Sequence, residues 1–315
     1  MELEVSAPVR ICDLGGWTDT WFGGPGRVLN VAVTPGVTVS VRELAGPPRL
    51  VIDVESPSPL VHAAVEVSPP PSDRGLEIRV RAAVPPGCGA GTSAAVAVAL
   101  LTALAESRGE PWSARSIARD AHRLEVEHLG LESGVQDQLS AALGGVNFIE
   151  IDAYPAGVVH RLPDWDDLGA RLSLVSVGRA HDSSSVHRDV IGRVAAQPST
   201  AFDRLRAAAM AARDAVLARD LRAFGAAMID NTEAQRALHA DLVGVDAQRV
   251  VDLAADCGAL GWKVNGAGGD GGSLTLLSAN ADAKRTLDAA VARLDARYRV
   301  FPIAISPTGL TIRRL

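Results

Sequence analysis

The fold is decided by the stretch Val84-Pro85-Pro86-Gly87-Cys88-Gly89-Ala90-Gly91-Thr92-Ser93-Ala94-Ala95, in which three alternating glycines follow two prolines. Residues 75–82, before it, alternate apolar and polar side chains, which predicts a half-buried strand. Residues 92–106, after it, are rich in Ala, Val and Leu and contain no Gly or Pro, which predicts a helix that stops at Gly109. The predicted order is therefore strand, glycine-rich loop, helix.

A glycine-rich loop in front of a helix is suited to binding an anion. The first amides of a helix lack internal partners, and the helix dipole adds partial positive charge there. Glycines allow positive φ and a close approach of the backbone to a phosphate. Thr92 and Ser93 could cap the helix or place a hydroxyl on a phosphate-bound Mg²⁺. The residues alone leave a second interpretation open, a glycine-rich turn in front of a core helix.

Length and composition indicate an ordinary globular protein. Its 315 residues are enough for a large core and two domains. The net charge of −6 argues against a nucleic-acid-binding protein, which usually needs a basic face. The acidic N-terminus lacks the pattern of a signal peptide, and no apolar run approaches the ~18 residues of a membrane-spanning helix. We therefore expect a cytoplasmic protein without membrane or nucleic-acid partners; a homodimer stays open.

The three cysteines, Cys12, Cys88 and Cys257, are far apart and show no metal-binding spacing. We expect them to be free, buried thiols in a reducing compartment.

The stretch from Pro85 to Ala95 resembles the phosphate-loop motif of the GHMP kinases, Pro-Pro-x-x-Gly-Leu-Gly-Ser-Ser-Ala-Ala, with Ala90 for Leu and Thr92 for the first Ser. Residues 7–19 resemble the first motif of that family, in the Gly-Gly-Trp-Thr-Asp form of the fucokinase and heptose 7-phosphate kinase branch. Residues 262–273 resemble the third motif, except that Asp270 replaces a Gly and Gly272 stands where an aromatic is usual.

This resemblance implies an α+β, two-domain GHMP kinase fold with the active site in the cleft between the domains. Residues 1–165 would form the N-terminal, ATP-binding domain and residues 166–315 the C-terminal α/β domain. The implied reaction is phosphoryl transfer from ATP, with Mg²⁺, to a hydroxyl of a sugar or sugar phosphate. The anomeric hydroxyl is the favoured acceptor. Two alternatives stay open: a kinase of another hexose, aminosugar or mevalonate-like alcohol, and an inactive relative that binds a sugar.

The resemblance also implies roles for single residues. Asp137 corresponds to the catalytic base, and Arg10 lies near the reacting hydroxyl. Asp19 would bind sugar hydroxyls, a task that suits a carboxylate because it can accept two hydrogen bonds from a vicinal diol. Glu125 and Ser93 would hold the metal, with Thr92 as the weaker hydroxyl candidate. The implied nucleotide-binding residues are Pro86, Gly87, Cys88, Gly89, Ala90, Gly91, Thr92, Ser93, Gly268 and Gly269.

The remaining substrate residues come from two loops. Gly16 and Trp17 belong to the first motif, beside Asp19. Residues 178–185 resemble a loop of the heptose 7-phosphate kinases, with the basic residue displaced to Arg179, so Arg179, His181, Ser183 and Ser184 are candidates for a substrate phosphate. The alternative for this loop is a cluster of serines that caps the next helix.

Three further expectations concern the frame around the site. Residues 28–41 are rich in Val and predict a hairpin around Pro35-Gly36. In Glu125-Val126-Glu127-His128 the two glutamates lie on different helix faces, because positions i and i+2 diverge by about 200°, so at least one is a solvated surface charge. The strands expected at 298–305 and 309–313 would complete the second domain.

Overall fold

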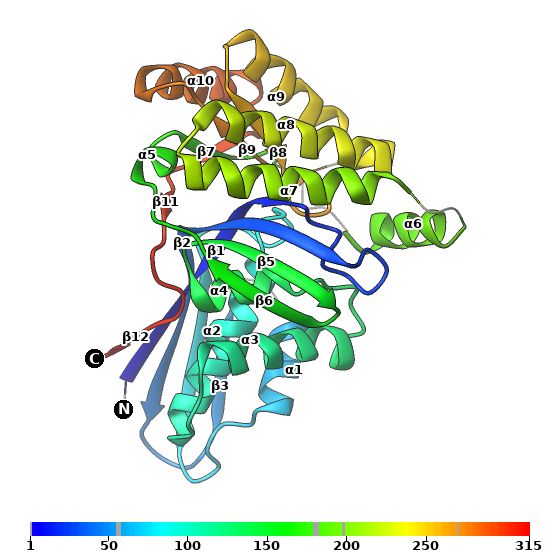
Figure 1. Cartoon of the computed structure of the whole chain (residues 1–315). Helices are drawn as coiled ribbons and strands as arrows, with labels where there is room; N and C mark the ends of the chain where they lie inside the picture. Colours follow the sequence, from blue (N-terminus) through cyan, green and yellow to red (C-terminus); the bar gives the residue numbers. More distant parts are fainter. Residues whose placement is uncertain (1, 55–57, 179–182, 197–198, 270) are drawn as a thin grey trace.

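The computed structural model describes residues 2–54, 58–178, 183–196, 199–269 and 271–315, apart from the side chains of residues 183–187 and 195–196. Two sheets with helices packed against them form the molecule (Figure 1). This mixed architecture confirms the predicted α+β fold.

The larger sheet has eight strands in the order β12-β1-β2-β4-β3, with β5 and β11 also pairing with β2 and β6 pairing with β5. Its strands are β1 (Glu2–Leu14), β2 (Gly26–Leu44), β3 (Leu50–Val54), β4 (Gly75–Ala82), β5 (Val146–Ala153), β6 (Ala156–Arg161), β11 (Ala304–Ile305) and β12 (Thr311–Arg314). The predicted strand at residues 75–82 is thus β4.

Strand β2 corrects the predicted hairpin. The chain runs through Pro35-Gly36 as one long strand, and residues on both sides of this point pair with β1, Val33 with Val9 and Val37 with Ala7. Gly36 allows close packing here, since a Cβ would lie 2.1 Å from the carbonyl oxygen of Ala7. The valine-rich pattern therefore reports one continuous strand whose valines are buried.

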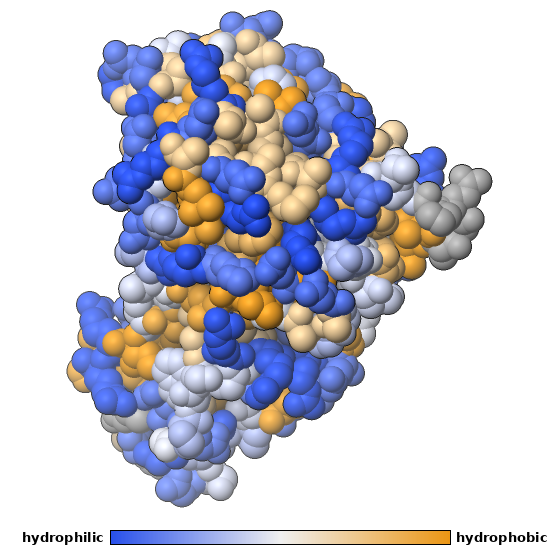
Figure 2. All heavy atoms as spheres, in the orientation of Figure 1, coloured by the Kyte–Doolittle hydropathy of each residue, from blue (hydrophilic) through white to orange (hydrophobic). Residues whose placement is uncertain are grey.

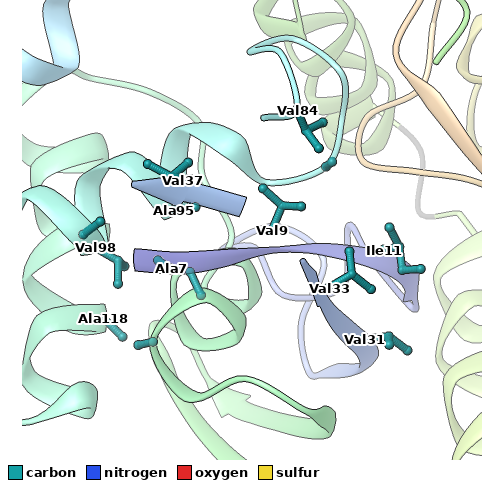
Figure 3. Close-up of a cluster of buried hydrophobic side chains, with 14 of the residues drawn as sticks. Ala7, Val9, Ile11, Val31, Val33, Val37, Val84, Ala95, Val98 and Ala118 are labelled. Carbon is teal, nitrogen blue, oxygen red and sulfur yellow. The ribbon is translucent and has the colours of Figure 1, made fainter. Parts of the chain in front are cut away.

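Helices cover the larger sheet and bring the glycine-rich loop to one end of it. They are α1 (Pro59–Val67), α2 (Thr92–Arg108), α3 (Ala114–Arg123), the π-helical turn η1 (Leu124–His128) and α4 (Gln136–Leu143). Helix α2 is buried along nearly all its length, which explains why it is apolar on every side. Its residues Ala95 and Val98 pack in one core with Val9 of β1 and Val37 of β2 (Figure 3).

The smaller sheet has the order β10-β7-β9-β8. Its strands are β7 (Leu172–Ser176), β8 (Gly261–Val264), β9 (Ser273–Leu277) and β10 (Arg299–Phe301). The helices of this part are α5 (Asp166–Gly169), α6 (Ser183–Ala196), α7 (Ala201–Ala218), α8 (Leu221–Leu238), the 3₁₀ turn η2 (Ala240–Leu242), α9 (Val245–Asp256) and α10 (Ala281–Leu294). Helix α7 contacts both β2 and α8 and so lies between the two parts (Figure 1).

The C-terminal strands return to the larger sheet. β10 joins the smaller sheet, as expected, but β11 pairs with β2 and β12 with β1. The expectation that residues 298–313 complete the second domain is therefore wrong for β11 and β12. The two termini lie close together as a result (Figure 1). The boundary at 165/166 stays a prediction.

The expectations from composition concern the surface, the helices and the cysteines. Hydrophilic side chains spread over both parts on the face seen in Figure 2, with apolar ones interspersed. None of the described helices is long and apolar enough to cross a membrane. All three cysteines are free, but Cys257 is exposed, contrary to the expectation that all are buried.

Candidate active site

A cavity lies where the glycine-rich loop meets the ends of β1 and β8. Its lining combines side chains from the first predicted motif, the loop, the start of α4 and the third glycine-rich segment: Arg10, Asp13, Trp17, Asp19, Thr20, Gly87, Gly89, Gly91, Thr92, Ser93, Glu132, Ser133, Gly134, Gln136, Asp137, Asn265, Gly266, Ala267, Gly268 and Gly272. The fold thus brings together residues that are more than 250 positions apart in the chain.

Gly91 precedes the first turn of α2 and lines the cavity. Its φ of 68° lies in the left-handed region, and a Cβ there would lie 3.1 Å from Cγ of Arg10 and 3.2 Å from Oδ2 of Asp137. Glycine is therefore favoured both by the backbone conformation and by the space. The positive end of the α2 dipole points to the same place, which favours negative charge in the cavity.

The hydroxyls that follow Gly91 have different roles. Thr92 is buried, and its hydroxyl donates to the carbonyl oxygen of Val84 at 3.2 Å. It does not cap the helix, because the N-cap residue is Gly91 and no side chain accepts a hydrogen bond there. Ser93 is exposed to the cavity, so its hydroxyl is the one available to a ligand.

Arg10 and Asp137 form a two-pronged ion pair in the cavity. Nε of Arg10 donates to Oδ1 of Asp137 at 2.7 Å, and Nη2 donates to Oδ2 at 3.0 Å. Arg10 also donates through Nη1 to the carbonyl oxygen of Gly89, which ties the pair to the glycine-rich loop. The side chain of Arg10 is only 6% exposed, whereas that of Asp137 is 24% exposed and reaches the cavity. The carboxylates of Asp137 and Asp13 raise the pKa of Arg10 despite its burial.

Asp19 is a buried carboxylate at the far wall of the cavity. One oxygen accepts a hydrogen bond from the backbone amide of Gln136 at 3.2 Å. Burial, and next the charge of Asp137, raises the pKa of Asp19 to about 6. Gly134 makes this position possible, since a Cβ there would lie 2.1 Å from Oδ2 of Asp19. The start of α4 therefore places Asp137 and holds Asp19.

Glu125 lies on the π-helical turn behind the cavity and is 5% exposed. Oε2 accepts hydrogen bonds from the hydroxyl of Ser133 at 2.7 Å and from Nε2 of Gln138 at 2.6 Å. Burial raises the pKa of Glu125 to about 7, and a hydrogen bond with Ser93 acts in the opposite direction. Glu127, two residues on, is exposed and pairs with Arg123, so it is the surface charge expected of one of the two glutamates.

The pair of Glu125 and Ser93 fits a magnesium site. The described residues contain no cluster of three or more His, Cys, Asp or Glu side chains that could hold a metal. Mg²⁺ does not need one, because it is usually bound by one or two carboxylates together with phosphate oxygens and water. A buried carboxylate with a raised pKa gains from a cation nearby, and a hydroxyl beside it supplies a second oxygen.

The third glycine-rich segment closes the cavity from the side of the smaller sheet. Gly266 lies against the glycine-rich loop, where a Cβ would be 3.0 Å from the carbonyl oxygen of Gly89. Asn265 accepts a hydrogen bond from the amide of Cys12 at 3.3 Å, which joins the segment to β1. Gly268 lines the cavity, whereas Gly269 is buried and donates to the carbonyl oxygen of Leu242.

Among the other residues predicted for the site, some line the cavity and others do not. Pro86 is exposed outside its lining, and the side chains of Cys88 and Ala90 point into the hydrophobic core. Trp17 lines the cavity and packs in a small core with Val190 of α6. A Cβ at Gly16 would lie 2.9 Å from Oδ2 of Asp13, so Gly16 makes room for that carboxylate.

The predicted phosphate-recognition loop lies largely outside the described residues. Arg179, His181 and Asp270 lie outside the described residues, as do the side chains of Ser183 and Ser184. Their proposed roles therefore stay predictions.

Sequence reasoning missed several polar residues in or beside the cavity, among them Asp13, Ser133, Gln136 and Lys263. Asp13 and Lys263 stood inside the recognised motifs and carry charge, which was the signal that could have singled them out. Ser133 and Gln136 flank Gly134 and have no chemical signature of their own in the sequence.

The chain is similar in sequence to several known kinases. Residues 59–145 match the family model "GHMP kinases N terminal domain". The chain is similar to D-glycero-alpha-D-manno-heptose 7-phosphate kinase of Campylobacter jejuni, at 27% identity over 60% of this chain and 57% of that protein. It is also similar to the bifunctional fucokinase/GDP-fucose pyrophosphorylase of Arabidopsis thaliana, at 28% identity over 87% of this chain and 30% of that protein. The alignments thus span little more than half of the first relative and less than a third of the second.

Nearly the whole chain can be superposed on a solved structure. The crystal structure of a D-glycero-D-manno-heptose 1-phosphate kinase from Bacteroides thetaiotaomicron superposes with a TM-score of 0.77 at 20% identity, covering 99% of both chains. Residues 59–145 thus match the N-terminal domain of the GHMP kinases, and the whole chain shares the fold of a solved heptose phosphate kinase.

Proposed function

We propose that the protein transfers a phosphoryl group from ATP to a hydroxyl of a sugar or sugar phosphate. The single observation that supports this most is the Arg10–Asp137 pair, held beside the glycine-rich loop and within the same cavity as Asp19. The curated relatives described above, named as kinases of heptose 7-phosphate and fucose, support the same reaction class.

In this proposal each side chain acts through charge and position. Asp137 accepts the proton of the sugar hydroxyl, since both of its oxygens keep a lone pair while they accept from Arg10. Arg10 orients Asp137 through its two hydrogen bonds and offers positive charge to the phosphoryl group as it moves. The amides at the start of α2 stabilise the developing negative charge, and Asp19 orients the sugar hydroxyls. Phosphoryl transfer depends mainly on positioning and electrostatics, so a few groups suffice.

Mg²⁺ belongs to the same proposal. Glu125 and Ser93 would hold the ion, which would supply positive charge for the phosphates of ATP. Ser93 is favoured over Thr92, whose hydroxyl is already bonded to the carbonyl oxygen of Val84.

For the substrate we propose a sugar that already carries a phosphate on a carbon remote from the reacting anomeric hydroxyl, as in a heptose 7-phosphate. Such a substrate carries about two negative charges and needs fixed donors. Arg179, His181 and the serines at 183 and 184 are the sequence candidates for that contact.

The test is ATP turnover across a panel of heptose 7-phosphate, free fucose, free galactose, free mannose and mevalonate. We expect kcat/KM to be highest for the phosphorylated sugar, and Arg179→Ala to remove that preference without weakening ATP binding. A higher kcat/KM for a free sugar would assign the loop to helix capping. No turnover of any alcohol by a protein that still binds ATP would point to an inactive sugar-binding relative.

A further inference from the structure

Asp13 and Lys263 form a buried ion pair between the two sheets, at the inner edge of the cavity. Nζ of Lys263, on β8, lies 3.1 Å from Oδ1 of Asp13, on β1, and the side chains are 0% and 2% exposed. Lys263 also donates to the carbonyl oxygen of Val264. Burying a charge is costly unless it is paired, so each residue depends on the other.

The same carboxylate faces the guanidinium of Arg10. Nη1 of Arg10 lies 4.0 Å from Oδ1 of Asp13, while Oδ2 of Asp13 accepts a hydrogen bond from the amide of Gly266 at 2.9 Å. Arg10 therefore lies between two carboxylates, Asp137 in direct contact and Asp13 just beyond hydrogen-bond distance. The lysine compensates the charge of the second carboxylate.

We propose that Lys263 is a positioning residue that neutralises Asp13 and thereby keeps Arg10 paired with Asp137. This inference rests on the proposed function for its effect on turnover, but the geometry that it describes does not. In a site that excludes water, a carboxylate without a partner attracts a neighbouring cation strongly. Without the lysine, the Nη1 end of Arg10 would be drawn from the carbonyl oxygen of Gly89 towards Asp13, and the two-pronged contact with Asp137 would tilt.

The critical comparison is between removing one charge and removing both. Lys263→Met leaves Asp13 unpaired, and Lys263→Gln removes the charge but keeps a hydrogen-bond donor. The double variant Asp13→Asn/Lys263→Met removes both charges, while the Asn oxygen can still accept from Gly266. Lys284→Met is the matched control, since Lys284 pairs with Asp288 at 2.6 Å on α10, outside the cavity.

Two readouts are measured on the full chain. The first is kcat and the sugar KM with the best substrate of the panel. The second is the exchange protection of the Arg10 Nε–H signal in ¹⁵N NMR, assigned by its loss in Arg10→Lys. A displacement of about 1 Å at a catalytic group can lower the rate ~10²-fold, so we expect that loss in kcat for both single lysine variants, with little change in KM. In the same variants we expect the exchange protection of the Arg10 Nε–H to fall together with kcat.

The double variant decides between positioning through charge and a merely structural link between the sheets. Recovery of kcat to within about fivefold of wild type, together with the NMR protection, supports the proposal. A double variant that keeps its thermal stability but stays as slow and as unprotected as Lys263→Met overturns it. If Lys263→Met fails to fold, Lys263→Gln and the double variant make the same comparison. If wild type phosphorylates nothing, the proposed function fails and the NMR readout alone decides on Lys263.

Discussion

At the scale of single residues, Asp137 carries the proposed chemistry. Asp137→Asn keeps a group that can bond to Arg10 but cannot accept the proton, and general bases contribute ~10²–10⁴-fold. We expect kcat to fall by that factor while the Kd of a non-hydrolysable ATP analogue changes little. Steady-state kinetics and calorimetry measure the two effects. Asp164→Asn, at a side chain 65% exposed, is the control. A variant that keeps more than about a tenth of wild-type kcat would refute Asp137 as the base.

Asp19 gives a prediction about stability and pH. Its pKa is raised from 3.8 to about 6 in the folded protein, so the folded state binds this proton more tightly than the unfolded state. The free energy of unfolding therefore falls as pH rises from 4 to 6, by up to about 3 kcal/mol for this residue. Asp19→Asn should recover that amount at pH 8 and nothing at pH 4, in urea unfolding. An equal difference at both pH values would contradict the raised pKa.

At the scale of elements, the turn before α4 fixes the geometry of the proposed sugar site around Asp19. Gly134→Ala would place a methyl group 2.1 Å from Oδ2 of Asp19, so the carboxylate must move. We expect the KM for the sugar to rise at least ~10-fold and the KM for ATP to stay near wild type. Gly192→Ala on α6 is the matched control, because a Cβ there meets nothing within 4 Å. Equal losses for both substrates would mean that the variant disturbs the fold.

The π-helical turn η1 and the start of α2 together make the proposed metal site. We expect Ser93→Ala and Glu125→Gln to raise the Mg²⁺ concentration needed for half-maximal turnover, with activity partly recovered at high Mg²⁺. Glu127→Gln is the control from the same turn, since Glu127 is an exposed partner of Arg123. Titration of turnover with Mg²⁺ measures this. An unchanged Mg²⁺ dependence in both variants would remove them from the metal site.

At the scale of the whole molecule, the C-terminal segment holds the larger sheet together. β12 pairs with β1 from Leu3 to Ser6, and the amide of Leu310 donates to the carbonyl oxygen of Ala142 in α4. Deleting residues 310–315 removes Leu310 and Ile312, which are partly buried against the core. Loss of one fully buried side chain of this size costs about 2–5 kcal/mol, so we expect the two partly buried ones to cost about that much together. We expect urea unfolding to show a loss in this range. Deleting Leu315 alone, 61% exposed, should cost much less. A deletion as stable as wild type would show that β12 contributes nothing.

Local sequence patterns are sufficient to predict the glycine-rich loop of the site and the helix that follows it. Glycines 87, 89 and 91 before an apolar helix predict an anion-binding loop, because backbone conformation and the helix dipole act over a few neighbouring residues. The three motifs in order also predicted the fold, which the comparisons confirm. Secondary structure that depends on local pattern, such as β4 and α2, followed the sequence closely.

Tertiary structure alone decided which of these residues meet. Residues 28–41 look like a hairpin from Pro35-Gly36, but both halves pair with β1, a partner that local pattern does not reveal. The return of β12 to β1 joins residues some 300 positions apart, and no periodicity reports it. The pair of Asp13 and Lys263 is of the same kind. Their charges are plain in the sequence, but only the packing of the two sheets brings Nζ of Lys263 to 3.1 Å from Oδ1 of Asp13. Contacts between distant segments arise from packing of the whole chain, and for that reason only the folded molecule shows them.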